Sequence, residues 1–272
     1  MEFIDIHSHI LPGLDDGSQT IGMSIEMARV ALADQIKIMV ATPHIKTGRF
    51  DYSKREILHR VDELNKHLKE NNVDLQVLPG AEYYLEPDLP QRLADGELLT
   101  INDTGRYLLI EFPSIMVPEH TERTLYEIQL QGVTPIIAHP ERNEVLAART
   151  DIMAAYSQRG LLAQVTSTSI TGLFGRRVAK AANKMVADGT VQILASDAHT
   201  PHRRGPLMSE AFHAVERLWG TQYAQMLGCA NPEHIISGRA VEIIRPQRKP
   251  TLSDTIQRSF QQLMSAGDNG GH

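Results

Sequence analysis

Histidine, aspartate and glutamate side chains directly follow several short hydrophobic runs in this chain. Five runs end in this way, at His7-Ser8-His9, Thr42-Pro43-His44, Glu111, His139 and Ser196-Asp197-Ala198-His199. A β-branched run of this length is typical of a buried strand. Because α/β enzymes build their sites at the carboxyl ends of strands, we expect these side chains to gather at one place. One such ending is common, but the repeated pattern indicates a metal centre.

The candidate ligands also have spacings that favour metal binding. His7 and His9 are two residues apart in an expected strand, so both side chains point to the same face. Asp197 and His199 repeat this spacing. A buried carboxylate such as Glu82 needs a compensating partner, and a bound cation would supply it. A lone His-x-His is often an ordinary feature of a strand, but its combination with the other candidate ligands is not. The eight candidates are His7, His9, His44, Glu82, Glu111, His139, Asp197 and His199.

The ligand types indicate which metals would bind. Imidazole and carboxylate without thiolate suit Mn²⁺, Fe or Zn better than Ca or Mg. Eight ligands exceed what one ion needs, so we expect two or three divalent ions, with Glu82 as a bridging carboxylate. Clusters of this kind activate a water molecule and clamp a phosphate during in-line displacement. The pattern therefore favours a metal-dependent phosphoesterase.

Strand and helix signals alternate along the chain and would position these residues. About seven β-α units without a linker predict one α/β domain with a parallel sheet and right-handed crossovers. We favour a barrel-like domain, because only a closed ring brings all the strand ends together; an open doubly wound sheet lacks its glycine-rich fingerprint here. Thr20 or Ser18 is expected to cap the first helix, and Asn231 the last. Strands are expected at 4–6, 38–41, 75–78, 108–110, 136–138, 161–165 and 193–195, and helices at 24–32, 53–70, 119–131, 177–187, 209–226 and from 231.

Composition excludes several classes of protein. The 272 residues carry a net charge of −6, which disfavours a nucleic-acid-binding surface. No apolar stretch approaches the roughly 20 residues of a membrane span, so we expect no membrane insertion. The acidic N-terminus lacks a signal peptide, and the one cysteine suits a reducing cytoplasm. Cys229 is not followed by a nearby arginine, which excludes a cysteine-based phosphatase. We expect one domain over residues 1–250, then a C-terminal helix and a disordered tail over 251–272.

The motifs together resemble the polymerase-and-histidinol-phosphatase (PHP) superfamily. The run DIHSHILPGLDDGS at 5–18 and the HPER segment at 139–142 look most like its bacterial capsular and exopolysaccharide tyrosine-protein phosphatase branch. The motifs extend to about residue 204, which is most of the chain. The resemblance implies a distorted (β/α)7 TIM-like barrel with a metal cluster, usually manganese, at the C-terminal ends of the strands. It also implies phosphotyrosine substrates on a membrane-associated tyrosine kinase that controls polysaccharide export.

The resemblance further assigns roles to individual residues. His7, His9, Glu82 and Asp197 would hold a first ion; Glu82, Glu111 and His139 a second; and His44 and His199 a third. The third ion needs a ligand from the first loop, where many relatives have histidine and this chain offers Asp15 and Asp16. We assign Asp15 as ligand and Asp16 as acid/base, with the reverse left open. Arg142 and Arg204 would contact the phosphate, with Arg203 as an alternative to Arg204.

The expected reaction is attack by metal-activated water on phosphorus, with a phenolate as leaving group. Such a leaving group has a pKa near 10, so it needs less protonation than an alkoxide. Two rivals remain: a small-molecule phosphomonoesterase of the superfamily, acting on a substrate like histidinol phosphate, and a non-catalytic metal-binding regulatory module. A metal-dependent nuclease is disfavoured by the acidic charge. Four aromatic residues near the motifs could shape substrate entry or simply pack: Phe50, Tyr52, Tyr83 and Tyr84.

Overall fold

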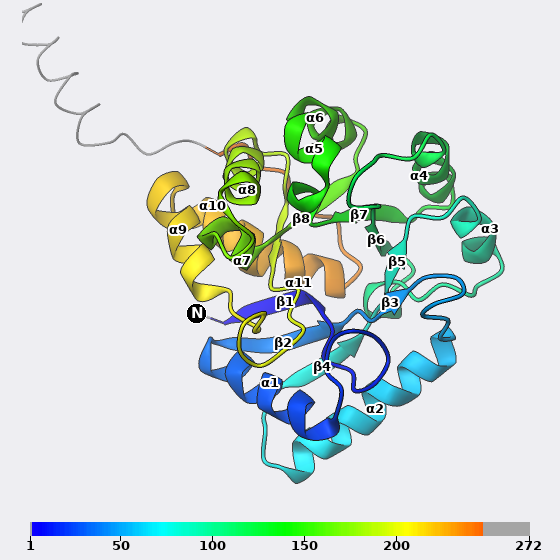
Figure 1. Ribbon diagram of the computed structural model, residues 1–272, viewed down its shortest axis with the longest axis vertical. Helices are drawn as coiled ribbons and strands as arrows, with labels where there is room; N and C mark the ends of the chain where they lie inside the picture. The colour runs from blue at the N-terminus through cyan, green and yellow to red at the C-terminus, as the bar shows by residue number, and fades with distance from the viewer. Residues whose placement is uncertain (1, 247–272) are drawn as a thin grey trace, which may run out of the picture.

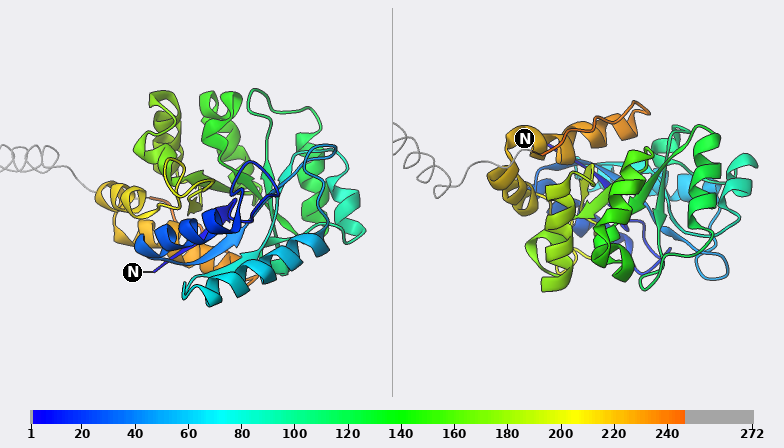
Figure 2. Two further views of the ribbon diagram at one scale, coloured as in Figure 1. Left: turned by 60° about the horizontal axis from the view of Figure 1, so that its bottom comes forward. Right: turned by 90° about the horizontal axis from the view of Figure 1, so that it is seen from above.

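The computed structural model describes residues 2–246 of the chain. Strands and helices alternate along this part, as the hydrophobic pattern predicts. Figures 1 and 2 show the helices arranged around the outside of the strands. The expected domain boundary at residue 250 and the expected helix and tail over 251–272 lie outside the described residues.

The strands form two parallel sheets. The three-stranded sheet has the order β1-β2-β4, and the six-stranded sheet has the order β3-β5-β6-β7-β8-β9. All neighbouring strands in both sheets run parallel, as α/β alternation requires. The strands are β1 (Phe3–Ser8), β2 (Ile36–Ala41), β3 (His44–Ile45), β4 (Gln76–Pro79), β5 (Glu82–Tyr84), β6 (Tyr107–Glu111), β7 (Thr134–Ala138), β8 (Leu162–Thr166) and β9 (Ile193–Ala195).

Two of the expected strands continue after a short interruption and so serve both sheets. β2 is followed almost at once by β3, and β4 by β5. Gly80 occupies the second interruption, where an added Cβ atom would lie 2.8 Å from Val40 Cγ1. A residue without a side chain is needed for this close approach. The continued strands then pair so that His44 lies opposite Glu82.

The first strand also lies beside the segment that follows the last strand. Ser8 forms a parallel bridge with Ala198, and the His9 amide donates to the Ala198 carbonyl at 2.8 Å. The Asp197 amide donates to the His7 carbonyl at 2.9 Å. These backbone bonds bring the two histidines near the N-terminus next to an aspartate nearly two hundred residues away.

The helices follow the strands, with two corrections to the expected pattern. Thr20 caps the first helix by accepting from the Met23 amide, which confirms one of the two expected caps. The helix expected over 209–226 is interrupted at Gly220, whose φ of 95° and ψ of 158° are not helical. Asn231 does not cap the last helix, because it already has helical φ and ψ. The α-helices are α1 (Ile21–Ala33), α2 (Lys54–Glu70), α3 (Leu89–Ala94), α4 (Thr121–Leu130), α5 (Glu144–Ala148), α6 (Thr150–Gln158), α7 (Ser167–Thr171), α8 (Arg176–Asp188), α9 (Ser209–Trp219), α10 (Thr221–Gln225) and α11 (Asn231–Ile236).

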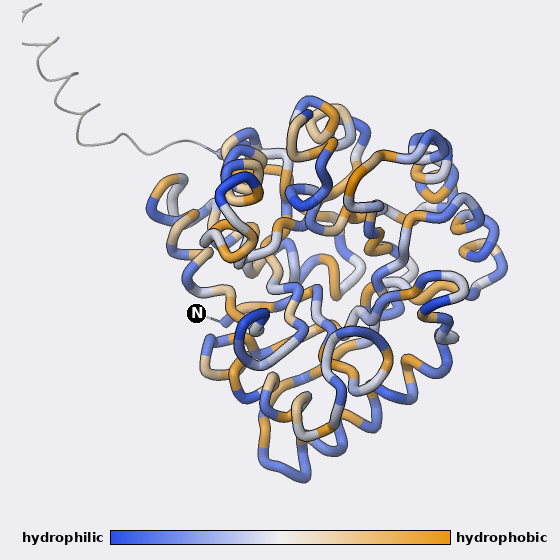
Figure 3. The backbone as a smooth tube through the Cα atoms, in the orientation of Figure 1, coloured by the Kyte–Doolittle hydropathy of each residue, from blue (hydrophilic) through white to orange (hydrophobic). Residues whose placement is uncertain are grey.

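Two hydrophobic clusters form the core. The larger one packs the helices against the strands and contains Phe212, with Trp219 partly buried against it. The smaller one takes residues from strands of both sheets, including Ile6, Leu109 and Ile193. In Figure 3 the hydrophobic segments accordingly concentrate on the inner side of the helices and along the strands. The two sheets therefore share one interior.

Candidate metal centre

All eight candidate ligands lie in one cluster of overlapping groups, and the carboxylate of Glu82 within it is fully buried. His7 Nε2 lies 3.3 Å from Glu82 Oε2 and 3.4 Å from Asp197 Oδ1. His44 Nδ1 lies 2.9 Å from Glu82 Oε2, and His139 Nε2 lies 2.9 Å from Glu82 Oε1. The fold therefore brings together side chains that follow strands from both sheets.

Within the described residues, the ligand atoms form overlapping groups in which all atoms lie within 4.8 Å of one another. The groups resemble the expected sets but do not coincide with them. The set expected for the second ion joins Glu82 and Glu111 with His139. In the structure His44 is grouped with these two carboxylates, and His139 Nε2 lies 3.9 Å from Glu111. The groups are His9, Asp16, His44 and His199; His7, Glu82 and His139; His7, His9 and Asp197; and His44, Glu82 and Glu111.

The two aspartates of the first loop occupy different positions. Asp15 is buried and accepts from His9 Nδ1 at 2.7 Å and from the Gly17 and His44 amides at 2.9 Å. Asp16 has a side chain that is 57% exposed, and its Oδ1 lies 3.5 Å from both His44 Nε2 and His199 Nε2. The geometry thus favours Asp16 as the loop ligand, and Asp15 as the residue that orients His9. This is the reverse of our assignment from the sequence.

Three histidines have their outer ring nitrogen fixed by a hydrogen bond. His7 Nδ1 bonds to Gln164 Oε1 at 2.9 Å, and His199 Nδ1 to the Asp197 carbonyl at 3.0 Å. Asp15 plays the same part for His9. An acceptor at Nδ1 keeps the proton there and leaves Nε2 free to bind a cation. Gln164 was missed in the sequence, although a polar residue within an otherwise apolar expected strand was a usable signal.

Replacing Gln164 with leucine is expected to weaken metal binding about 10- to 100-fold, because the tautomer of His7 is no longer fixed. Mn²⁺ affinity measured by isothermal titration calorimetry would check this. Gln164→Glu keeps an acceptor oxygen and serves as the matched control, which should bind Mn²⁺ more tightly than Gln164→Leu. Equal affinities of Gln164→Leu and the wild type would contradict the role.

The buried charges of the cluster shift one another's pKa values. Burial alone would raise the pKa of Glu82, but His7, His44 and His139 hold it well below its usual range. Burial, with Arg142 nearby, lowers the pKa of His139 to about 4. Burial and the charge of Glu82 raise the pKa of Glu111 to about 7. Burial lowers the pKa values of His7, His9 and His44, but the neighbouring carboxylates outweigh it and raise all three, so a cation would displace protons from these imidazoles on binding.

A single atom gives the clearest sign that a cation belongs here. Glu82 Oε2 is buried and accepts no hydrogen bond from the described residues. Nitrogens of His7, His9 and His44 nevertheless lie within 3.5 Å of it. Buried carboxylate oxygens are normally hydrogen-bonded or bound to a metal. The donor set is therefore a fit for shared divalent ions.

Two ligands have left-handed backbone conformations. His139 has a φ of 30° and Asp197 a φ of 52°. Such values are uncommon for residues other than glycine, and they occur often at functional sites. Both residues directly follow a strand, so the turn directs the side chain back over the strand ends. The backbone amide of His139 donates to Gln164 Oε1 and that of Asp197 to the His7 carbonyl, which stabilises both turns.

Both predicted phosphate-binding arginines approach the same oxygen. Arg142 donates to Asp197 Oδ2, and Arg204 Nη2 donates to it at 2.9 Å. The other oxygen of Asp197 faces His7 and His9. Arg203 is exposed. The geometry therefore favours Arg204 over Arg203 at the site.

One aromatic residue near the arginines was missed. The guanidinium carbons of Arg142 and Arg204 lie 4.9 and 5.8 Å from the centroid of Phe174. Cation–π contacts of this kind hold a planar guanidinium in place. Phe174 lies in the loop between α7 and α8, where no sequence motif marked it.

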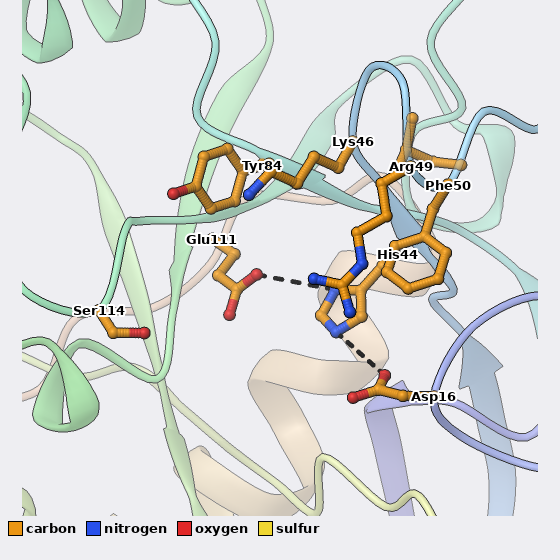
Figure 4. A pocket seen from close by; sticks show the side chains of 9 residues that line it. Asp16, His44, Lys46, Arg49, Phe50, Tyr84, Glu111 and Ser114 are labelled. Carbon is orange, nitrogen blue, oxygen red and sulfur yellow. Dashed lines mark ion pairs between the residues drawn. The ribbon is translucent and has the colours of Figure 1, made fainter.

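A pocket of about 250 Å³ opens beside the cluster, and Figure 4 shows its lining. The Phe50 ring stacks on His44, with centroids 5.8 Å apart. Tyr84 also lines the pocket, whereas the Tyr83 hydroxyl accepts from the Leu99 amide inside the core. Of the four aromatic residues left open by the sequence, two thus face the pocket and two, Tyr83 and Tyr52, pack against the core.

Comparison with known proteins shows the family of the chain. A family model described as capsular polysaccharide synthesis, CpsB/CapC, matches residues 3–237. The chain belongs to this family. The resemblance seen in the sequence is confirmed. The matched residues include every predicted ligand and both arginines.

Individual members of the family are similar over most of the chain. The tyrosine-protein phosphatase YwqE of Bacillus subtilis is 36% identical, covering 90% of this chain and 95% of its own. The tyrosine-protein phosphatase CpsB of Streptococcus agalactiae is 29% identical, over 88% of this chain and 100% of its own.

Solved structures show the same relationship. Crystal structures of YwqE from B. subtilis and CpsB from Streptococcus pneumoniae are described as metal-dependent tyrosine phosphatases. The match is 36% identical with a TM-score of 0.86, and covers 91% of this chain and 100% of the other. A dihydropyrimidinase from Brevibacillus agri, at 10% identity and a TM-score of 0.53, shares the fold alone. None of the described helices is long and apolar enough to cross a bilayer.

Proposed function

We propose that this chain is a metal-dependent protein-tyrosine phosphatase of capsule or exopolysaccharide synthesis. The observation that carries the proposal is the meeting of histidine and carboxylate ligands around Glu82, in a family whose members bear that name. We further propose Mn²⁺ as the bound ion, in two or three copies. When bound, such ions lower the pKa of water toward neutral and stabilise charge on phosphoryl oxygens.

For the ligands of each ion we keep the sets that the resemblance implies, which the observed groups overlap, and change only the loop ligand. His7, His9, Glu82 and Asp197 would hold the first ion, and Glu82, Glu111 and His139 the second. His44, His199 and Asp16 would hold the third, with Asp15 orienting His9. A hydrogen bond with His199 holds the pKa of Asp16 well below its usual range, so this carboxyl stays ionised and is a poor general acid. The low basicity of the phenolate makes a strong acid unnecessary.

Arg142 and Arg204 would bind the phosphoryl group of the substrate. Both guanidinium groups lie at Asp197 Oδ2, beside the ligand groups, and Phe174 supports them. A planar guanidinium can donate two parallel hydrogen bonds to phosphate oxygens. The two arginines would orient the phosphorus for in-line attack and offset charge that develops in the transition state.

We infer that the two sheets act as one distorted (β/α)7 TIM-like barrel, in a single domain that ends near residue 250. The shared inner cluster and the bridge between Ser8 and Ala198 support this inference. The substrate that we propose is a phosphotyrosine protein, specifically a membrane-associated tyrosine kinase. The proposed location is the cytoplasm, where Cys229 would stay reduced.

A comparison of substrates tests the proposed function. The Mn²⁺-loaded protein is expected to hydrolyse a phosphotyrosine peptide at least about tenfold faster, by kcat/KM, than histidinol phosphate. Phosphate release measured with malachite green would report both reactions. A preference for histidinol phosphate would favour the small-molecule phosphatase. Absence of turnover on either substrate would favour the non-catalytic module.

The neighbouring arginines Arg203 and Arg204 form a matched pair for a test of phosphate binding. Arg204→Ala or Arg142→Ala is expected to lower kcat/KM about 10- to 100-fold, because a charge-assisted hydrogen bond to phosphate is lost. The metal content, measured by mass spectrometry, should stay that of the wild type. Arg203→Ala, which removes the same charge one residue away, should change kcat/KM by less than about twofold. An equal loss in Arg203→Ala would contradict the assignment.

A further inference from the structure

The outer wall of the pocket beside the cluster is a tight loop that follows β3. The Lys46 amide donates to the Phe50 carbonyl and the Phe50 amide donates back to Lys46, each at 2.9 Å. Gly48 forms the turn with a φ of 75°. The Thr47 hydroxyl donates to Glu86 at 2.7 Å, which ties the loop to the segment after β5. The loop therefore holds its side chains in fixed positions next to the site.

Two cations of this loop line the pocket. Lys46 Nζ lies 3.7 Å from the centroid of the Tyr84 ring, and Arg49 Cζ lies 4.9 Å from that of Phe50. Neither cation forms an ion pair with a carboxylate of residues 2–246. Figure 4 shows Lys46 alongside Tyr84, while Arg49 extends over the pocket towards His44. Placement over aromatic rings orients a cation but leaves its charge unneutralised.

The remaining charges of the pocket do not require these cations. The carboxylates in the lining, Asp16 and Glu111, both belong to ligand groups of the cluster. Arg142 and Arg204 supply the cations at Asp197, and neither lines this pocket. Lys46 and Arg49 therefore form a second pair of cations, next to the reacting group but separate from the first pair.

We propose that Lys46 and Arg49 bind an anionic group on the substrate chain beside the phosphotyrosine, so that acidic tyrosine segments are preferred. This inference rests on the proposed function and adds a specificity subsite to it. The anionic group is a carboxylate of an adjacent aspartate or glutamate, or the phosphate of a second phosphotyrosine. A small phosphomonoester has no such group and gains nothing from the two cations.

Three peptides with one central phosphotyrosine test the inference: one flanked by Asp and Glu, one by Asn and Gln, and one by a second phosphotyrosine. The wild type is expected to favour the acidic over the neutral peptide about tenfold in kcat/KM. In Lys46→Gln/Arg49→Gln this ratio should fall close to one. Binding of non-hydrolysable phosphonate analogues, followed by fluorescence anisotropy, should show the same change in Kd. The doubly phosphorylated peptide distinguishes phosphate from carboxylate as the preferred anion.

Lys66→Gln is the control, because it removes one positive charge from the exposed side of α2 at a residue that does not line the pocket. It should keep the wild-type ratio. The single variants Lys46→Gln and Arg49→Gln are measured separately, so the test stays decisive if the double variant does not fold. A ratio near one in the wild type, or one unchanged in both single variants, would overturn the subsite while the proposed phosphatase stands. Absence of hydrolysis of all three peptides by the wild type would instead overturn the proposed function.

Discussion

Chelation of divalent cations is expected to lower the turnover of a phosphotyrosine peptide by about 10³-fold or more, and added Mn²⁺ should restore it. Bound ions contribute several kcal/mol of transition-state stabilisation, and each 1.36 kcal/mol changes a rate tenfold. Among the described residues of the site no other group would replace them, because a hydrogen bond with His199 keeps Asp16 ionised and the role we propose for the arginines is phosphate binding. Initial rates before and after EDTA treatment, followed by Mn²⁺ titration, would measure the effect.

The choice of ion provides the control for this prediction. The imidazole-rich ligand set suits Mn²⁺, Fe or Zn better than Mg²⁺ or Ca²⁺, so the latter two should restore less activity at equal concentration. Circular dichroism of the chelated protein would show whether the loss comes from unfolding. Full activity in a preparation shown by mass spectrometry to contain no transition metal would refute the metal centre.

Glu82→Gln is expected to lower kcat/KM about 10³-fold or more, the largest effect of any single substitution in the cluster. Both oxygens of Glu82 are used: Oε1 lies near His139, and Oε2 near His7 and His44. An amide has nearly the same shape but no negative charge, and only one of its two end atoms can bind a cation. It therefore cannot bridge two ions. Metal content and steady-state kinetics together would measure the loss.

The matched control is Glu63→Gln, because this substitution makes the same chemical change on the exposed side of α2. It should retain the wild-type rate and metal content. Thermal unfolding of both variants without metal would separate misfolding from loss of ions. If Glu82→Gln kept its full metal content and more than about a tenth of the activity, the bridging role would be wrong.

Much of the site could be predicted from sequence because its ligands follow strands. A run such as Ile136-Ile137-Ala138 is local in the chain, and the residue after it, His139, necessarily lies at the carboxyl end of that strand. His7 and His9 share a face for the same local reason. The eight candidate ligands could therefore be selected without knowledge of how the strands pair.

Roles that depend on contacts between distant segments could not be assigned from the sequence. Asp15 and Asp16 are neighbours with the same side chain, so only the folded loop shows which one faces His44 and His199. Gln164 orients His7 from a strand more than 150 residues away. Lys46 and Arg49 are ordinary loop cations until the turn at Gly48 places them over the pocket. In each case the role of the residue depends on a contact with another segment, which the local sequence does not specify.

The sequence by itself determined the chemistry of this protein: parallel α/β architecture, histidine and carboxylate ligands at strand ends, and a family of metal-dependent phosphatases. The architecture and the candidate ligands follow from hydrophobic periodicity and from spacings within single segments, and the family from the resemblance of motifs such as DIHSHILPGLDDGS and HPER. Only the tertiary structure decided how the chain continues from β2 into β3 and from β4 into β5, which places consecutive strands in different sheets, and which side-chain atoms of the site face one another. The physical reason is that strand register and side-chain contacts depend on packing between distant segments, and no single segment of the chain specifies them.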